Sequence, residues 1–309
     1  MNALDESRIS ELRNSISTFA AISFLLSAAI TVCAADAPDA TPGVFTNPER
    51  VIINNYDQDA MEPFISLDGN YLFFNNSNNP PPGSSTKLYY ATRIDDLHFQ
   101  YVGEIAGVNA AGLNAVASMD TNRKFYFIST RSYMQTFSTV YWGDFVAGTV
   151  SNVEPVPGIS KRKPGFVNFD QGMSPDGNTL YFVDGFFGTG NFPQKAVLTI
   201  AKRKGNRFER LANSRAIMRK INDNDLNYAP CPTASGLELF WTRVDPANVS
   251  GIGIYTATRA NTSKPYGTPV KIDAATGFVE APTISADGKS LYYHKQENNV
   301  FVIYRLTRP

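Results

Sequence analysis

The chain has 309 residues, and its 28 basic and 28 acidic side chains give a formal net charge of zero. A composition of 43% apolar and 12% aromatic residues indicates a folded chain, long enough for one large domain or two small ones. The neutral balance argues against broad attraction to nucleic acid or anionic membranes, and two cysteines exclude a disulfide framework.

The first predicted element is an uncharged apolar stretch over residues 16–32, followed by the small residues Ala34 and Ala35. This pattern predicts a secretory signal, residues 1–35, removed after Ala35. The mature protein, residues 36–309, is then expected in the periplasm or outside the cell. The alternative is an uncleaved signal that anchors the protein to a membrane.

Five segments of one pattern follow a short predicted strand over residues 49–54. Each contains a Ser-x-Asp-Gly turn or a variant of it and then a Leu-Tyr-Phe-like strand, over residues 62–74, 114–127, 170–182, 229–241 and 281–293. Measured on Ser66, Ser118, Ser174, Thr233 and Ser285, the spacings are 52, 56, 59 and 52 residues. Repeats of this length are typical of propellers and arrays.

Each repeat predicts a short strand, a tight turn and a second strand that is apolar on both faces. Glycine accepts the positive φ of such a turn, and an aspartate side chain can bond its own backbone there. Strands buried on both faces belong to sheets stacked between neighbouring sheets. Third strands are predicted over residues 87–92, 139–142, 196–201, 253–256 and 300–304, and fourth strands over 99–102 and 207–211.

The last repeat stops after its third strand, and the strand over residues 49–54 is left over at the other end. We therefore predict an all-β fold, a single five-bladed β-propeller whose final blade is closed by the N-terminal strand. Residues 36–309 form this one domain.

The repeats resemble the WD40-like propeller repeats of the Ser-Pro-Asp-Gly-Lys-x-Leu-Tyr-Phe type, which occur in many bacterial envelope proteins. Ser174-Pro-Asp-Gly-Asn-Thr-Leu-Tyr-Phe182 and Ser285-Ala-Asp-Gly-Lys-Ser-Leu-Tyr-Tyr293 carry the pattern most fully. The resemblance covers essentially the whole mature chain. It implies a fold that serves binding modules, scaffolds and some enzymes, so it names no chemistry.

Acids and amides gather in the loops that precede the first strand of each repeat, and a ring would bring them to the mouth of its central channel. The candidates are Asp57, Asp59, Glu62, Asn114, Asp170, Asp225, Asn227 and Glu280. Converging carboxylates can perform acid–base chemistry at a glycosidic bond or bind Ca²⁺ through oxygen. The alternative is that these short polar residues cap turns and solvate loops.

The loops that follow the second strands add a cation, aromatics and an imidazole, namely Arg131, Phe186, Phe187 and His294. Aromatic rings beside polar groups suit a sugar, a planar ligand or a protein partner. Alternatively, the rings close the ends of the blades. His294 is the only histidine expected on this face, so a Ser-His-Asp triad would have to use it.

These observations favour a secreted or periplasmic propeller that binds a small-molecule or carbohydrate ligand, or an envelope protein, at its loop face. The alternative is an enzyme that uses the channel-mouth carboxylates, such as a glycoside hydrolase, or another small-molecule enzyme in the same channel. No cofactor is predicted apart from Ca²⁺, and neither a nucleic-acid partner nor a membrane is expected unless the signal stays uncleaved.

Overall fold

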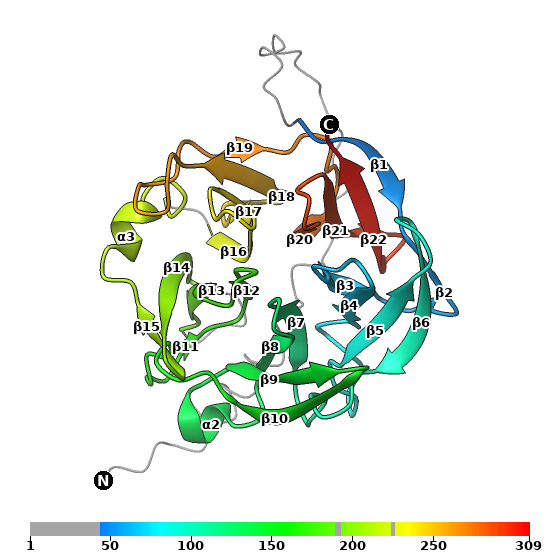
Figure 1. The fold of residues 1–309 in the computed structure, drawn as a ribbon, viewed down its shortest axis with the longest axis horizontal. Helices are drawn as coiled ribbons and strands as arrows, with labels where there is room; N and C mark the ends of the chain where they lie inside the picture. The colour runs from blue at the N-terminus through cyan, green and yellow to red at the C-terminus, as the bar shows by residue number, and fades with distance from the viewer. Residues whose placement is uncertain (1–43, 189–192, 224–225) are drawn as a thin grey trace.

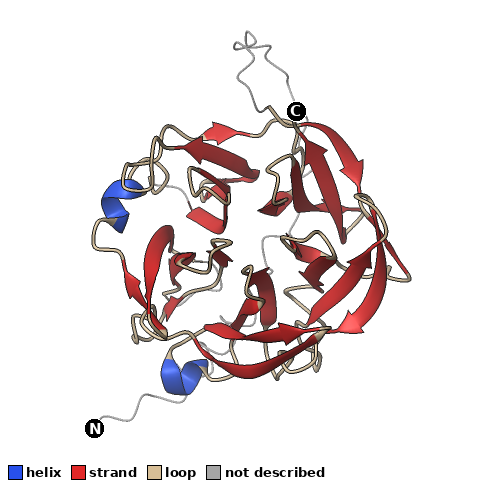
Figure 2. Ribbon diagram, in the orientation of Figure 1, coloured by secondary structure: helices blue, strands red, loops and turns tan. Residues whose placement is uncertain are grey.

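Five small sheets surround a central axis and form a five-bladed β-propeller (Figure 1), as predicted. The computed structural model describes residues 44–188, 193–223 and 226–309, so the predicted signal lies outside the described residues. Strands dominate the described chain (Figure 2), with two helices of one turn each. Within these ranges no helix is long and apolar enough to cross a membrane.

Each blade is named by its order in the chain, and its strands are given in order from the channel to the rim. Blade one contains β3 (Met61–Ile65), β4 (Tyr71–Asn75), β5 (Leu88–Arg93), β6 (His98–Glu104) and β2 (Ile52–Asn54). Blade two contains β7 (Asn114–Met119), β8 (Lys124–Ser129), β9 (Val140–Val146) and β10 (Thr149–Pro155). Blade three contains β11 (Phe166–Val167), β12 (Gln171–Met173), β13 (Thr179–Phe186), β14 (Lys195–Lys204) and β15 (Arg207–Arg210).

Blade four contains β16 (Leu226–Pro232), β17 (Glu238–Asp245), β18 (Asn248–Thr258) and β19 (Val270–Lys271). Blade five contains β20 (Val279–Ile284), β21 (Ser290–Glu297), β22 (Val300–Thr307) and β1 (Thr46–Arg50). The helices are α2 (Tyr133–Thr136) and α3 (Ser214–Ile217), and both lie in loops at the rim (Figure 1).

The N-terminal segment closes the ring, as expected, but it does so with two strands in two blades. β1 pairs antiparallel with β22 and completes blade five, and β2 pairs parallel with β6 and adds a fifth strand to blade one. Between them, the Val51 N–H donates to the Ile303 carbonyl. The single predicted strand over residues 49–54 is therefore wrong in detail, because the chain passes from one blade to the next at Val51.

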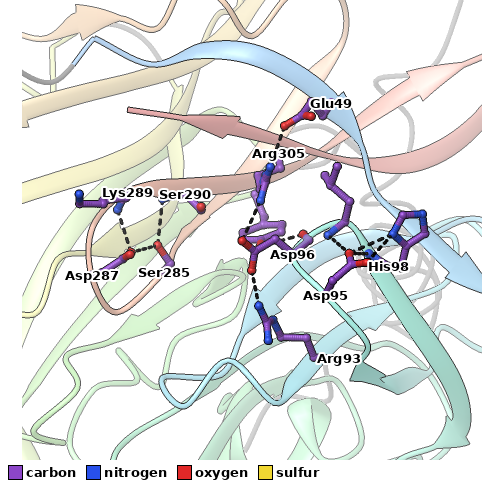
Figure 3. Close-up of polar contacts among 12 residues, drawn as sticks. Glu49, Arg93, Asp95, Asp96, His98, Ser285, Asp287, Lys289, Ser290 and Arg305 are labelled. Atoms are coloured by element: carbon purple, nitrogen blue, oxygen red, sulfur yellow. Dashed lines mark hydrogen bonds and ion pairs between the residues drawn. The ribbon is translucent and has the colours of Figure 1, made fainter. Parts of the chain in front are cut away.

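Ion pairs reinforce this junction on the rim (Figure 3). The Arg305 guanidinium lies between Glu49 of β1, at 2.7 Å, and Asp96 of blade one, at 3.2 Å. Arg93 reaches Asp96 from the other side at 2.6 Å. One arginine thus links the first strand, the last strand and the neighbouring blade.

The core consists of five aromatic and aliphatic clusters, each between two neighbouring blades. The second strands supply side chains to both neighbours, as their sequences predict: Phe73 packs toward blade two, whereas Leu72 and Phe74 pack toward blade five. All three are fully buried. Truncation of such a residue to alanine costs about 3–5 kcal/mol.

Hydrogen bonding corrects the repeat alignment in blade two. Asp120, not Ser118, occupies the position of Ser66: its backbone N–H donates to the Lys124 carbonyl, and its carboxylate accepts the Lys124 N–H. Ser66 makes the same two contacts with Tyr71 through its N–H and hydroxyl. The spacings from Ser66 to Asp120 and from Asp120 to Ser174 are then both 54 residues.

A repeated arginine at the end of the third strand links three of the blades to the preceding blade. Arg203, Arg259 and Arg308 each donate from Nε to the glycine carbonyl of their own blade's turn. Their guanidinium groups then reach Tyr126, Tyr181 and Glu238 of the preceding blade. The sequence analysis did not find these contacts, because the arginines follow Ser174, Thr233 and Ser285 of the turns at different spacings of 29, 26 and 23 residues.

Candidate functional site

A strained backbone position marks the mouth of the channel in four of the five blades. Glu62, Val116, Ala229 and Ala281, each four residues before the turn's Ser, Thr or Asp, have φ between 50° and 54°. Non-glycine residues avoid this left-handed region, especially β-branched ones, and such strain costs of order 1–3 kcal/mol. The N–H groups of these four residues donate to His294, Asn75, Asp170 and Thr242 of the preceding blade.

His294 connects blade five to blade one at this position. Its Nδ1 accepts the Glu62 N–H at 2.9 Å, and its Nε2 lies 3.2 Å from the Glu280 carboxylate. Because Nδ1 is an acceptor, the proton of the neutral ring is on Nε2 and is donated to Glu280. The imidazole is 1% exposed, so both of its nitrogens are committed to the protein. His294 therefore links the backbone N–H of Glu62 to the side-chain carboxylate of Glu280, and it does not serve as the base of a triad.

Glu280 and Asp170 complete the cluster from blades five and three. The other Glu280 oxygen accepts the hydroxyl hydrogen of Tyr228, and Asp170 Oδ2 accepts the Ala229 N–H at 3.0 Å. Asp170 and Glu280 are both buried. The site thus unites three carboxyl groups, one imidazole and one phenol from blades one, three, four and five.

The electrostatics indicate that these carboxyl groups act on one another. Burial raises the pKa of Asp170 well above its usual range, and the nearby charges of Glu62 and Glu280 raise it further. Burial also raises the pKa of Glu62, although His294 and a hydrogen bond from Asn78 oppose that increase. Burial and Glu280 raise the pKa of Tyr228. Asp170 and Glu62 therefore hold protons at a higher pH than isolated carboxyl groups do.

Glu62 is held by a chain of amides within its own blade. Asn78 donates to Glu62 Oε1 at 2.9 Å, and Asn75 donates to Asn78 Oδ1 at 3.0 Å. Glu62 Oε2 is buried and has no hydrogen bond of normal geometry among the described residues, although the Val116 N–H lies close enough to the carboxyl group to lower its pKa. A buried polar atom without a partner is costly, so this oxygen is the free acceptor of the cluster.

The channel beside Glu62 contains a cavity of about 50 Å³, lined by the inner strands of all five blades. Ser118, Gln171 and Thr283 contribute its polar groups, and the Thr283 hydroxyl has no partner among the described residues. Ligand pockets for small molecules usually have volumes of roughly 300–1,000 Å³, whereas one water needs roughly 10–15 Å³. The channel itself therefore accommodates only a few water-sized molecules.

Four further predicted residues have hydrogen bonds outside this cluster. Asp57 is exposed and accepts a hydrogen bond from Gln58, and Asp59 accepts the Phe301 N–H at 2.8 Å. Asn114 bonds its own loop and Ser129, and Asn227 accepts the indole N–H of Trp241 at 2.9 Å. The alternative of turn and loop stabilisation describes the contacts of Asp57 and Asn114, whereas Asp59 bonds strand β22 of blade five and Asn227 bonds an indole of the core.

The predicted cation and aromatic residues of the loops after the second strands also pack against other side chains. Arg131 stacks over the rings of Phe127 and Tyr141, at 5.2 and 5.1 Å, and bonds Asn114. Phe186 packs against Phe166 with ring centres 4.9 Å apart. Phe187 is only 2% exposed and lies in the core between blades three and four. Asp225 lies outside the described residues.

Sequence reasoning missed Tyr228, Asn75 and Asn78. Tyr228 occupies the same repeat position as Glu280, five residues before the turn's Thr or Ser, and Asn75 occupies the same position as His294. Aligning the repeats residue by residue beyond the turn would have found both. Within the described ranges, no group of three or more histidine, cysteine or acidic residues has a geometry suited to a metal ion.

Comparison with known structures places this fold beside carbohydrate-active enzymes. A family 117 glycoside hydrolase from the marine bacterium Zobellia galactanivorans matches with a TM-score of 0.55 and 11% identity, covering 86% of this chain and 91% of that one. The catalytic domain of a GH62 α-L-arabinofuranosidase from Coprinopsis cinerea matches with a TM-score of 0.57 and 11% identity, covering 87% and 98%. At this identity the likeness concerns the fold alone.

TolB from Acinetobacter baumannii matches less well, with a TM-score of 0.44 and 14% identity over 82% of this chain and 54% of that one. A likeness at this level carries no argument about function. No protein-family profile and no curated protein matches the sequence.

Proposed function

We propose that this protein binds a carbohydrate at the mouth of its channel, with Glu62 as the contacting residue and Asp170 and Glu280 as the neighbouring carboxyl groups that set its electrostatic environment. The observation that carries the proposal is the meeting of these three carboxyl groups from three blades, with Glu62 Oε2 buried and lacking a hydrogen-bond partner among the described residues. A sugar hydroxyl can donate a hydrogen bond to such an oxygen. One or two hydroxyl groups also fit in the small cavity beside Glu62, which is too small for a larger group.

The fold comparison supports the ligand class without naming the ligand. Several structures of similar size and fold are glycoside hydrolases, and their matches cover most of both chains. This fold thus occurs among enzymes that act on carbohydrates.

Hydrolysis of a glycosidic bond is the second candidate, favoured by one observation: the raised pKa of Asp170. A carboxyl group with a raised pKa is the kind of group that serves as a general acid in glycoside hydrolysis, and Glu280 would be the second carboxyl group of the pair. Against this candidate stand the burial of Asp170 and the hydrogen bonds that already occupy Glu280. We therefore place binding first.

The test is calorimetric titration of the mature chain with a panel of neutral and acidic oligosaccharides. We expect Glu62→Gln to weaken binding by about tenfold or more, because an amide N–H₂ replaces the free acceptor. Glu104→Gln is the matched control, since Glu104 is exposed on outer strand β6 and pairs with Lys87. Equal binding by the wild type and Glu62→Gln would contradict the proposal.

A reducing-end assay on the same oligosaccharides separates the two candidates. Turnover by the wild type that falls by about a hundredfold or more in Asp170→Asn supports hydrolysis. Binding without turnover supports a binding module.

We also infer that the repeats belong to the WD40-like Ser-Pro-Asp-Gly family and that the protein works in the periplasm or outside the cell. The turn sequences of blades three and five support the first inference, and the apolar stretch over residues 16–32 supports the second. Mass spectrometry of the protein purified from its native envelope or medium would test cleavage after Ala35.

A further inference from the structure

A groove of about 950 Å³ lies on the outer rim where blade two meets blade three, well away from the channel mouth. Figure 1 shows α2, β10 and β15 approaching one another in this region. The groove is lined by the loop after α2, by the chain between β10 and β11, and by the start of β15. Its volume is at the upper end of the range for ligand pockets.

The charged side chains that line this groove are all positive. Arg162 and Arg207 line it and are exposed, and no carboxylate is among its lining residues. Arg207 Nε lies 3.9 Å from Glu209, at the outer limit of an ion pair, so its guanidinium keeps donors available. A guanidinium donates through a planar fork that matches a carboxylate, and two of them in one groove favour an anionic occupant.

Backbone strain at two lining residues supports a functional role for the groove. Phe137 and Arg162 both have a left-handed backbone, with φ of 53° and 50°. Ser160 holds them together, because its hydroxyl donates to the Phe137 carbonyl and accepts the Arg162 N–H at 3.1 Å. The neighbouring Lys161 turns inward instead and pairs with Asp184 at 3.1 Å. The basic run Lys161-Arg162-Lys163 is thus divided, and Arg162 is the member that lines the groove.

The apolar part of the lining favours a peptide over a sugar, although Gln135, Ser138 and Asn206 add polar groups. Phe137, Pro155 and Pro157 form an apolar surface beside the two arginines, and proline offers no N–H to a hydroxyl. Such a surface suits carboxylates that alternate with apolar side chains. We propose that this groove binds an acidic, apolar-containing peptide segment of a partner protein, with Arg162 and Arg207 pairing its carboxylates.

The test uses fluorescence anisotropy of a fluorescein-labelled eight-residue peptide that repeats Glu-Pro-Glu-Leu. We expect the double variant Arg162→Gln/Arg207→Gln to weaken binding by about tenfold or more. Arg215→Gln/Arg219→Gln, on and beside α3, changes the net charge equally at exposed residues outside the groove and should weaken binding by less than about twofold. Wild-type binding should also weaken as salt rises from about 0.05 to 0.5 M.

Three results would overturn the proposal. The first is no binding at peptide concentrations up to about 1 mM. The second is equal binding of a Gln-Pro-Gln-Leu peptide or equal losses in the two double variants. The third is displacement of the peptide by an oligogalacturonate at a much lower concentration, which would assign the groove to an acidic sugar. Thermal unfolding of each variant checks the fold, and the salt dependence of the wild type tests the ionic contact without any variant.

Discussion

The two faces of this propeller both carry acidic residues, but their carboxyl groups make different kinds of contact. At the turn face, Asp68, Asp176 and Asp287 each accept a serine hydroxyl and a backbone N–H from two residues away. At the channel mouth, several contacts of the carboxyl groups cross blades: Asp170 accepts the Ala229 N–H, and Glu280 accepts the Tyr228 hydroxyl hydrogen. Contacts within the turn stabilise one blade, whereas contacts at the mouth depend on the closed ring.

The pKa values follow this division. Partial burial would raise the pKa of Asp176, but hydrogen bonds from Ser174 and Asn178 lower it below its usual value, and the Ser285 hydroxyl does the same for Asp287. Burial raises the pKa of Asp170 and Glu62 at the mouth. The three turn aspartates thus ionise more readily than isolated carboxyl groups do, whereas Glu62 and Asp170 at the mouth ionise less readily.

The largest expected effect is the loss of His294. His294→Ala removes the acceptor of the Glu62 N–H and a donor to Glu280, and both groups stay buried in the ring. We expect a loss of about 3–5 kcal/mol in the free energy of unfolding, measured by urea denaturation. A loss below about 1 kcal/mol would mean that water replaces the imidazole and that the mouth is not a closed network.

The second prediction contrasts the two faces by pH. A raised native pKa means that the folded protein binds more protons, so Asp170 makes stability fall as pH rises from about 4 through its native value. Asp176 has a lowered pKa, so its contribution is present above about 4 and is lost as pH falls through its native value. Urea denaturation between about pH 3 and 8 should show that Asp170→Asn removes the alkaline loss and Asp176→Asn removes the acid loss. Parallel pH profiles of the two variants would refute this contrast.

The smallest expected effect concerns a single turn. Ser174→Ala removes the hydroxyl that donates to Asp176 and accepts the Thr179 N–H. We expect a loss of about 1–2 kcal/mol, with binding at the mouth unchanged, because these contacts stay within blade three. Asp57→Asn, on the exposed loop before β3, is the control and should change stability by less than about 0.5 kcal/mol. A change in ligand affinity in Ser174→Ala would show that the two faces are coupled.

The fold was predictable because its signals are local and repeated. The Ser-x-Asp-Gly turns and the strands apolar on both faces indicated five blades, and the spare N-terminal strand indicated closure. The alignment of blade two with the other repeats could not be predicted from the sequence of its turn, because Asp120 replaces serine and the turn is one residue shorter. Only the hydrogen bonds of Asp120 and Lys124 revealed the equivalence.

The candidate site was predictable only in part, because its contacts cross blades. Glu62, Asp170 and Glu280 were expected at the mouth from their place before the inner strands. Nothing local distinguishes them from Asp59 or Asn114, whose side chains bond backbone groups nearby in the fold. The role of His294 as a link between Glu62 and Glu280 joins positions 232 residues apart in the chain and needs the ring itself.

The double placement of the N-terminal segment has a consequence for how the protein reaches its native state. The register of β1 and β22 pairs Thr46 with Thr307, so blade five has its outer strand only when the distant ends of the propeller meet. Contacts of such long sequence separation form slowly, since a large loop entropy must be overcome first. Four blades can assemble in chain order, but during synthesis the ring stays open until the last strand has emerged. Until then the inner ends of the blades, including Glu62 without its histidine partner, face an incomplete neighbour.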